Sequence, residues 1–380
     1  MSDRMRSTFS SLGLLVGVII GAGMFALPYA VARAGIMWGI IHAFIAFGTL
    51  TLIHLLYGEV VFSTSGTHRL PGYVGKYLGK NAQRVSFFSA LVGFYGALLV
   101  YGLLGGMFLN KLFGGESFIW SLLFFIIAGF VLVFDLRKIG TINFVLTFVL
   151  IAVIILLSAF LMPHVDIAKI PRMNMDNWFL PYGVFLFAFA GASAIPDVAD
   201  VFHKRNERLF RRVVVLSTLI PLLLYALFIT AVAGVMGTET PPDGISGLER
   251  FIGSKAIVFG SLMGLLAVGT SFLTLGTDLK KLFIYDYSLR HYTAWGIVVA
   301  VPPLLFLLGL TDFVAAIGVV GAVAVGIDGV LILSTALTVC QKNGGCRIGS
   351  FSIGRFLPWM LIVLLGAGVI YEIVEKIYSL

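Results

Sequence analysis

The chain has 380 residues, of which 59 % are hydrophobic and only 12 % are charged, and its mean hydropathy is +1.03. Soluble proteins carry about 25 % charged residues, so this composition excludes a soluble globular protein. We interpret the net charge of +8 as attraction to anionic lipid headgroups on one membrane face, not to nucleic acid.

Apolar blocks follow one another along the chain with only short gaps between them. A helix needs about 20 apolar residues to cross a bilayer, and the gaps leave no room for a soluble domain. We therefore predict an all-α integral membrane protein with one transmembrane domain over residues 1–380. The eleven expected helices cover residues 8–34, 36–62, 84–113, 116–134, 139–162, 178–203, 211–236, 251–280, 290–309, 311–339 and 355–378.

Basic residues are unevenly distributed between the loops. If the N-terminus is cytoplasmic, 19 of the 26 Lys and Arg residues fall on the cytoplasmic side and seven fall outside. The positive-inside rule therefore predicts a cytoplasmic N-terminus and an extracytoplasmic C-terminus. The inner set consists of Arg4, Arg6, Arg69, Lys76, Lys80, Arg84, Arg137, Lys138, Lys204, Arg205, Arg208, Arg211, Arg212, Lys280, Lys281, Arg290, Lys342, Arg347 and Arg355.

The first apolar block contains an interruption, "GVIIGAGMFALPYA" at residues 17–30. Gly21 and Gly23 unwind at low cost, and Pro28 cannot donate a backbone N–H group. These residues predict a broken helix, although glycine in a membrane helix also serves close packing. A break in lipid is tolerated only where it lines a cavity or is buried in protein. The expected half-helices are residues 8–20 and 24–34.

The sixth block carries a second interruption, "FAFAGASAIPDVAD" at residues 187–200, in which Gly191 and Ser193 are again followed by a proline, Pro196. The two interruptions occupy equivalent positions if the chain has two five-helix halves, which insert with opposite orientations because five is odd. Paired broken helices in inverted halves are the best sequence indication of a transporter's central site. The two expected halves and the extra helix cover residues 8–162, 178–339 and 355–378.

Broken helix ends can bind a zwitterion without a charged side chain. The second half-helix of the first block directs N–H groups, from about Gly23 to Phe25, at the membrane centre, where they suit a carboxylate. The half-helices that end near Ile20 and Phe189 present carbonyls, which suit an ammonium group or a metal cation. No charged side chain lies around either break, so we predict a substrate without net charge, such as a neutral amino acid.

The residues expected to bind the substrate lie at the two breaks and on the third block, from which two tyrosine side chains can reach the same place. The alternative for the phenylalanines is simple packing or contact with lipid, since the chain has 33 of them. The expected substrate-binding residues are Ile20, Gly21, Ala22, Gly23, Met24, Phe187, Phe189, Ala190, Gly191, Ser193, Tyr95 and Tyr101.

Three stretches carry a resemblance to a known family. "GVIIGAGMFALP" resembles the first-helix motif of the amino acid–polyamine–organocation superfamily. The sixth block, with "LSTLIPLLLYALF" at 216–228 and "AVGTSFLTLGTDLKKLF" at 267–283, is similar to the hydroxy- and aromatic amino acid permeases of the tyrosine and tryptophan type. The resemblance implies a LeuT-type fold, in which two inverted five-helix repeats and one extra helix surround a central amino acid site that works by alternating access.

The resemblance also implies a sodium site between the first and eighth helices. Its ligands would be the carbonyls of Gly17, Ile20 and Ala267. The hydroxyls of Thr270 and Ser271 would complete it. The residue spacing agrees, because hydroxyls recur on one face of this otherwise apolar helix. The alternative is that these hydroxyls bond to carbonyls of their own helix.

Two acidic residues are further candidates for gating or for carrying a proton. Asp328, in "AVGIDGV" near the middle of the tenth block, is ionisable at membrane depth and therefore functional by default. The alternative is a structural partner for a hydroxyl or for broken backbone. Asp197 follows the second break on the cytoplasmic side and is expected to gate the inner pathway.

We therefore expect a secondary transporter of the cell membrane, not an enzyme. It would be a multi-pass symporter of a neutral amino acid, with aromatic and other large apolar ones among the candidates. The expected coupling ion is Na⁺, and no other cofactor, no nucleic acid and no protein partner is expected beside the substrate and the lipid bilayer. H⁺ coupling is the alternative within this class. An amino acid sensor or a channel of the same fold is the alternative outside it.

Overall fold

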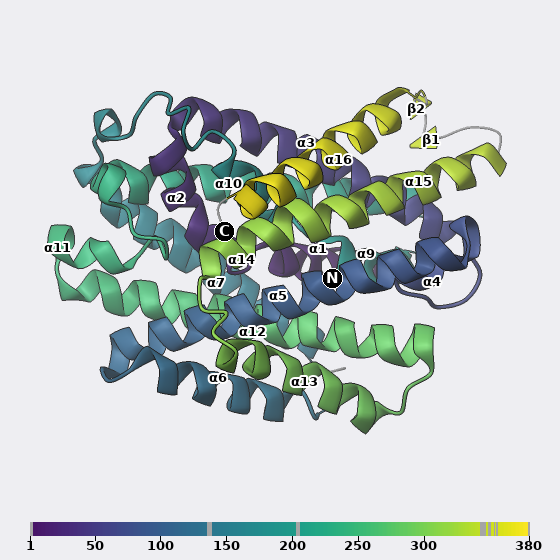
Figure 1. Cartoon of the computed structure of the whole chain (residues 1–380), viewed down its shortest axis with the longest axis horizontal. Coiled ribbons are helices and arrows are strands. Elements are labelled where there is room, and N and C mark those ends of the chain that lie inside the picture. The colour runs from purple at the N-terminus through teal and green to yellow at the C-terminus, as the bar shows by residue number, and fades with distance from the viewer. Residues whose placement is uncertain are drawn as a thin grey trace.

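The computed structural model describes residues 3–134, 139–202, 206–342, 347–348, 351–352, 354 and 356–378. Most of these residues are helical, and the long helices run along one common direction (Figure 1). The helices of the first half are α1 (Asp3–Ile19), α2 (Gly23–Ala34), α3 (Ile36–Phe62), α4 (Leu70–Leu78), α5 (Lys80–Phe113), α6 (Ser117–Val131) and α7 (Ile139–Leu161).

The second half follows the same plan. Its helices are α8 (Leu180–Ala188), α9 (Ile195–Phe202), α10 (Glu207–Met236), α11 (Glu249–Ile252), α12 (Ser254–Tyr287), α13 (His291–Leu307), α14 (Phe313–Val319), the π-helix η8 (Val320–Val325), α15 (Gly326–Lys342) and α16 (Phe356–Tyr378). Short 3₁₀ turns and one small β-hairpin complete the described structure: η2 (Met162–His164), η3 (Ile167–Lys169), η4 (Ala192–Ala194), η6 (Gly237–Glu239), η7 (Ser246–Leu248), β1 (Arg347–Ile348) and β2 (Phe351–Ser352).

The described part of the chain has eight helical stretches that are long and apolar enough to cross a membrane, and two of them combine several elements: Leu180–Phe202 contains α8 and α9, and Phe313–Lys342 contains α14, η8 and α15. The pair α1–α2 makes a ninth span, whose halves Thr8–Ile19 and Gly23–Ala34 are bent by 50° at the break. Helices α6 and α13 are apolar but have only 15 and 17 residues. An all-α membrane protein is thus confirmed. The count of eleven spans stays a prediction, because these two are shorter than the about 20 residues of a typical span.

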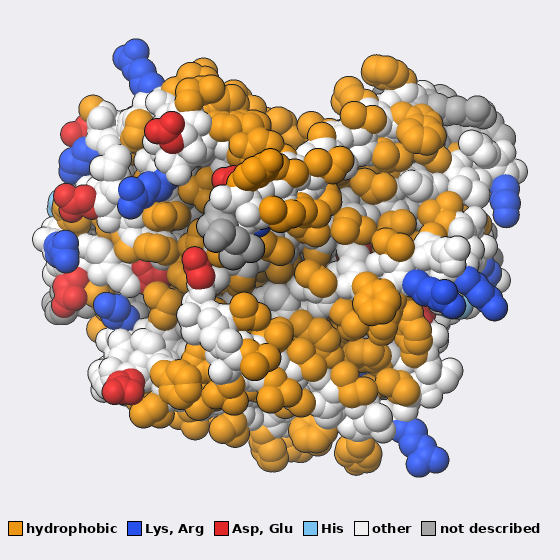
Figure 2. Space-filling model, in the orientation of Figure 1, with side chains coloured by type: hydrophobic (Ala, Val, Ile, Leu, Met, Phe, Trp, Pro, Cys, Tyr) orange, Lys and Arg blue, Asp and Glu red, His pale blue; other side chains and the backbone are white. Residues whose placement is uncertain are grey.

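The outer surface suits a lipid environment. Figure 2 shows apolar side chains across the middle of the visible face, whereas Lys, Arg, Asp and Glu side chains gather at the two ends. Large apolar side chains such as Phe44, Phe88 and Leu223 are 62–65 % exposed. Apolar surface on this scale is typical of a membrane-contacting face.

Both breaks lie inside the helix bundle. Helix α1 contacts α7, α9, α10 and α12, and α2 contacts α8 and α10. Ile20, Ala22 and Phe189 are completely buried. Because neighbouring helices surround the unwound residues, the breaks meet the condition for irregular backbone at membrane depth. The boundaries of the two inverted repeats, 8–162 and 178–339, stay a prediction.

Helix α4 lies where a loop was expected, between α3 and α5. It begins with Pro71 in its first turn, where the missing N–H group is harmless. It ends before Gly79, whose φ of 89° lies in a region that glycine adopts without steric cost. Two further glycines and the short length of the segment hide the helical pattern in the sequence.

Helix α12 is longer than its apolar block, which ends at residue 280. It continues to Tyr287 because its basic side chains find partners inside the protein. Lys280 Nζ donates to the Leu132 carbonyl at 3.1 Å, and Lys281 Nζ donates to Asp197 Oδ2 at 2.8 Å. Hydropathy alone places the helix end at the first of these charges.

The π-helix η8 widens the tenth span in its middle. It packs against α8 and α5, and Gly321 allows this contact because a Cβ there would collide with the Gly183 carbonyl oxygen. Ser89 on α5 donates to the Ala324 carbonyl at 3.1 Å. Such π-bulges occur frequently at functional sites, and η8 lines the cavity described next.

Candidate functional site

A cavity of about 110 Å³ lies between the two helix breaks. This is several times the about 10–15 Å³ that one water molecule needs. Both breaks, α3, α5, η8 and α15 form its wall, with one residue from α12. Among the 24 described residues that line the cavity, four have polar side chains: His54, Tyr101, Ser193 and Asp328. The space is therefore mostly apolar, with a few polar groups that can orient a ligand.

The first break begins after Ile19 and ends at Gly23, within one residue of the expected half-helices. We expected free N–H groups from about Gly23 to Phe25. The structure shifts this set, because Met24 N–H donates to the Gly21 carbonyl at 3.3 Å and Phe25 N–H to the Ala22 carbonyl at 3.1 Å. Within the described residues, the N–H groups of Ala22 and Gly23 have no protein acceptor.

The second break runs from the end of α8 at Ala188 to the start of α9 at Ile195. Tyr225 on α10 connects it to the first break, because its buried hydroxyl lies 2.9 Å from the Ile19 carbonyl oxygen and 2.8 Å from that of Ala188. A phenol has one proton, so the hydroxyl is shared between the two helix ends. The carbonyls keep further lone pairs for an ammonium group or a cation.

The two breaks also touch each other directly. A Cβ on Gly23 would lie 2.7 Å from the Ala188 Cα atom, so only glycine fits where α2 meets α8. At Gly21 the neighbours are polar, and a Cβ would lie 3.1 Å from both Ser271 Oγ and the Tyr101 hydroxyl oxygen. Gly21 therefore leaves a small space that these two hydroxyls border.

The structure distributes the expected substrate-binding residues over three places. Ile20, Ala22, Met24 and Phe189 are buried beside the breaks but do not line the cavity. Tyr95 lies elsewhere, with its hydroxyl donating to the Ile297 carbonyl on α13 at 3.2 Å. The roles of all these residues in binding stay a prediction. Those that line the cavity are Gly21, Gly23, Tyr101, Phe187, Ala190, Gly191 and Ser193.

The expected cation ligands lie where α1 contacts α12, and their hydroxyls differ. Ser271 Oγ is fully buried; the Tyr101 hydroxyl approaches it, but no hydrogen bond of good geometry to it is present among the described residues. Thr270 Oγ1 lies 2.8 Å from the Leu266 carbonyl oxygen and 3.1 Å from that of Ala267, which is the self-bonding that the sequence left open. Its lone pairs remain available to a cation.

Helix α7 adds an oxygen that the sequence analysis missed. Thr147 is buried, and its Oγ1 lies so close to Gly17 that a Cβ there would collide with it. Helices α1, α7 and α12 contact one another, so the Thr147 hydroxyl belongs to the same region as the expected ligands. A threonine in an apolar block gives no signal of its own in a single sequence, and this block contains a second one, Thr141.

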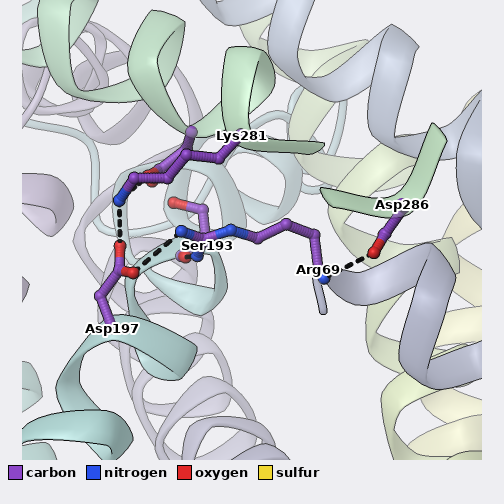
Figure 3. Close-up of polar contacts among 6 residues, drawn as sticks. Arg69, Ser193, Asp197, Lys281 and Asp286 are labelled. Carbon is purple, nitrogen blue, oxygen red and sulfur yellow. Dashed lines mark hydrogen bonds and ion pairs between the residues drawn. The ribbon is translucent and has the colours of Figure 1, made fainter. Parts of the chain in front are cut away.

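A charged cluster lies beside the second break, at Ser193 (Figure 3). Arg69, in the loop between α3 and α4, donates to Asp197 Oδ1 at 2.9 Å and to the Ser193 carbonyl at 3.2 Å. Lys281 Nζ donates to the other Asp197 oxygen and lies 3.8 Å from Asp278 Oδ1. Asp286 accepts from the Arg69 backbone N–H at 3.1 Å. We call Arg69, Asp197, Asp278, Lys281 and Asp286 the Arg69 network.

The Arg69 network joins three elements that are far apart in the sequence. Burial by itself would lower the pKa of the Arg69 guanidinium, but the nearby carboxylates of Asp197 and Asp278 raise that pKa above its usual value. Arg69 therefore stays charged. A smaller cavity of about 60 Å³ lies between the network and the central cavity, with Ser193 and Asp328 on the walls of both. The network thus lies at one end of the space around the second break.

Asp197 was predicted from the sequence, but its partners were not. Arg69 lies outside the apolar blocks and reads as a loop residue, and Lys281 reads as the start of the next loop. Tyr225 lies in the stretch at residues 216–228, and nothing in the sequence distinguishes it from the 12 other tyrosines. One signal was present, since an acidic residue just after a break needs a basic partner when it is buried.

Comparisons with known proteins agree with this architecture. A family model described as "Tryptophan/tyrosine permease family" matches residues 4–374. Tyrosine-specific transport system 1 of Haemophilus influenzae is 25 % identical over 83 % of this chain and 84 % of its own length. Glutamine transporter 2 of Aliivibrio fischeri is 24 % identical over 88 % of this chain and 90 % of its own.

The fold also resembles a solved structure, that of MhsT in complex with L-phenylalanine. The TM-score is 0.70, with 14 % sequence identity, over 97 % of this chain and 99 % of that chain. At this identity the likeness concerns the fold alone. It confirms the LeuT-type fold that the sequence resemblance implied.

Proposed function

The chain belongs to the tryptophan/tyrosine permease family and is a multi-pass membrane transporter, not an enzyme, and we propose that it imports a neutral amino acid by alternating access. One observation carries this proposal. The central cavity lies between two helix breaks whose own residues carry no charged side chain. Backbone groups at such breaks bind both charges of a zwitterion and leave the side chain to the apolar wall.

Each charge of the substrate has a matching group. The N–H groups of Ala22 and Gly23 at the start of α2 suit the carboxylate, and the helix dipole adds to their attraction. The carbonyls of Ile19 and Ala188 suit the ammonium group. The names of the relatives mention tyrosine, glutamine and phenylalanine, which all have uncharged side chains, and this supports a neutral substrate here.

Sodium is the coupling ion that we propose. The proposed ligands are all oxygen atoms, which a hard cation prefers. They would be the buried Ser271 hydroxyl, the Thr270 hydroxyl and the carbonyls of Gly17, Ile20 and Ala267. An ion there would hold α1 against α12 and so favour the conformation that binds the substrate. Such coupling typically amounts to about 1–3 kcal/mol, a factor of roughly 5 to 150 in affinity, and it is reciprocal.

Proton coupling is the second candidate, and one observation favours it. Asp328 lines the central cavity, and its Oδ1 atom is buried without a hydrogen-bond partner among the described residues. An ionisable group at such a place can take up a proton with the substrate. The two candidates differ in which gradient drives uptake.

We further propose that the protein lies in the cell membrane with a cytoplasmic N-terminus. The Arg69 network and the loop before α10 would then face the cytoplasm. The basis is the distribution of Lys and Arg between the loops. In this orientation the described structure is closed by the Arg69 network on the cytoplasmic side.

Reconstitution in liposomes tests the proposed function. Radiolabelled neutral amino acids are offered with an inward Na⁺ gradient, with an inward H⁺ gradient, and with neither. We expect accumulation of at least one neutral amino acid that needs the Na⁺ gradient. Accumulation that needs only the H⁺ gradient would replace sodium by a proton. No accumulation under any gradient would contradict the proposal.

A further inference from the structure

The central cavity has a polar end that the helix breaks do not explain. His54 on α3 is 1 % exposed, and its Nδ1 atom has no hydrogen-bond partner among the described residues. The Oδ1 atom of Asp328 on α15 is also buried and has no hydrogen-bond partner among the described residues. Both side chains line the cavity. Two buried polar side chains with unpaired atoms thus line one mostly apolar space.

These two side chains come from helices that meet. Helices α3 and α15 contact each other, and a Cβ on Gly329 would lie 3.0 Å from Ile53 Cδ1, so the positions next to Asp328 and His54 touch. Ser89 approaches Asp328 but donates to the Ala324 carbonyl. In the described part of the chain no basic side chain forms an ion pair with Asp328.

The polar end lies within reach of a ligand held at the first break. Tyr101 on α5 lies beside the first break, because its hydroxyl oxygen is 3.1 Å from where a Cβ on Gly21 would be. Further along α5, Gly93 faces Ala324, which lies one turn before Asp328. Tyr101 and Gly93 are eight residues apart, which is about 12 Å along the helix axis, and the turn from Ala324 to Asp328 adds about 6 Å. Helical side chains point toward the N-terminus of their own helix, and α5 and α15 run in opposite directions (Figure 1). Tyr101 and Asp328 therefore lean toward each other and shorten this span.

We propose that His54 and Asp328 form the side-chain end of the substrate site, and that they select a large neutral amino acid whose side chain ends in a hydrogen-bond donor, a phenol or a carboxamide. The Asp328 carboxyl accepts from that donor. A neutral imidazole donates from one ring nitrogen and accepts at the other, so His54 pairs with the oxygen of the same group. This inference rests on the proposed function.

The same geometry disfavours apolar substrates. A phenylalanine or methionine side chain would fill the cavity but leave both polar groups buried and unpaired. Leaving one such group unpaired weakens binding by roughly 5- to 150-fold. Sites that hydrogen-bond a substrate group reject the analogue that lacks it for the same reason.

Matched substrate pairs test the proposal in the purified, detergent-solubilised full chain. Isothermal titration compares tyrosine with phenylalanine and glutamine with methionine. We expect the polar member of at least one pair to bind tenfold or more tightly than its apolar partner. In His54→Phe and Asp328→Leu this ratio should fall below threefold, while the apolar member binds at least as tightly as it does to wild type, because one buried polar group fewer is left unpaired. That retained affinity shows that the variants are folded.

His42→Phe is the control variant. His42 is also a buried histidine on α3, but it bonds to the Trp38 carbonyl at 2.8 Å and does not line the cavity. Its replacement should leave the ratio unchanged. If Asp328→Leu does not fold, Asp328→Asn replaces it, and the ratio should fall by threefold or more because one carboxylate acceptor is lost.

Several results would overturn this assignment while leaving the proposed function intact. One such result is that phenylalanine and methionine bind to wild type as tightly as tyrosine and glutamine do. An equal loss of affinity for both members of a pair in the variants would also overturn it, because a proton-binding or structural role would weaken the binding of both substrates alike. If lysine binds more tightly than glutamine, His54 and Asp328 form a site for a cationic side chain instead. Only the failure of every neutral amino acid to bind would contradict the proposed function itself.

Discussion

At the scale of single residues, the two neighbouring hydroxyls on α12 are in different states. Ser271 Oγ is buried without a hydrogen bond of good geometry among the described residues, whereas Thr270 Oγ1 bonds to carbonyls one turn earlier in its own helix. The sequence shows only that both lie on one polar face. Which hydroxyl is available depends on rotamers and on Gly21 opposite, and these are properties of the packed structure.

Removing these hydroxyls one at a time tests the sodium proposal. Ser271→Ala should abolish most of the Na⁺ stimulation of substrate binding, because a free ligand is lost. Thr270→Ala should reduce it less, since this hydroxyl also bonds within its helix. Isothermal titration in NaCl and in choline chloride measures both. Equal Na⁺ stimulation in wild type and in the double variant would exclude the site.

Tyr225 is the residue whose role was least visible in the sequence. Tyr225→Phe removes the hydroxyl that lies between the Ile19 and Ala188 carbonyls, so we expect the free energy of unfolding to fall by about 1–3 kcal/mol and substrate affinity to fall with it. Thermal unfolding in detergent and titration measure the two effects. Tyr182→Phe is the matched control, because the buried Tyr182 hydroxyl has no partner among the described residues. A similar effect of both changes would contradict a specific role for Tyr225.

At the scale of elements, the broken helices were predictable and the elements around them were less so. Small residues followed by a proline are a local signal, Gly-x-Gly at the first break and Gly-x-Ser at the second, and this signal located both breaks. Helix α4 and the charged end of α12 were missed because they bond to residues that are distant in the sequence: Gly72 N–H on α4 donates to Asp286 at 2.9 Å, and Lys281 on α12 donates to Asp197 at 2.8 Å. The π-helix η8 depends on the close approach of Gly321 to α8, which a sequence pattern does not encode.

The Arg69 network should hold α9, α12 and the loop before α4 together. Asp197→Asn removes the carboxylate that pairs with both Arg69 and Lys281, so that end of the molecule should open more often. Breaking a fully buried ion pair lowers the free energy of unfolding by about 3–5 kcal/mol. We expect a smaller loss here, because the Asp197 side chain is 31 % exposed. The rate at which a thiol reagent labels Ser193→Cys, with Cys340 and Cys346 replaced, measures opening.

Labelling of Ser193→Cys should be several times faster in Asp197→Asn than in the parent protein. Glu207→Gln is the control, because Glu207 forms only a peripheral pair with Arg211 at 3.8 Å. An unchanged labelling rate in Asp197→Asn would show that the network does not gate this end.

At the scale of the whole molecule, the membrane architecture followed from composition and block length, and the resemblance supplied the fold. The orientation is a prediction from charge. It implies that a cysteine at position 206, in the loop before α10, reacts with a membrane-impermeant reagent only after the cells are permeabilised. Labelling of Asn206→Cys in intact cells would reverse the topology.

The central claim is that a neutral amino acid binds in the cavity between the two breaks. The most direct test is equilibrium binding to wild type, Gly21→Ala and Gly48→Ala. A Cβ on Gly21 enters the space beside Ser271 and Tyr101, whereas a Cβ on Gly48 meets nothing within 4 Å. We predict that Gly21→Ala weakens binding about tenfold or more, the loss of one charge-assisted hydrogen bond, and that Gly48→Ala binds like wild type. Unchanged binding in Gly21→Ala would contradict the account.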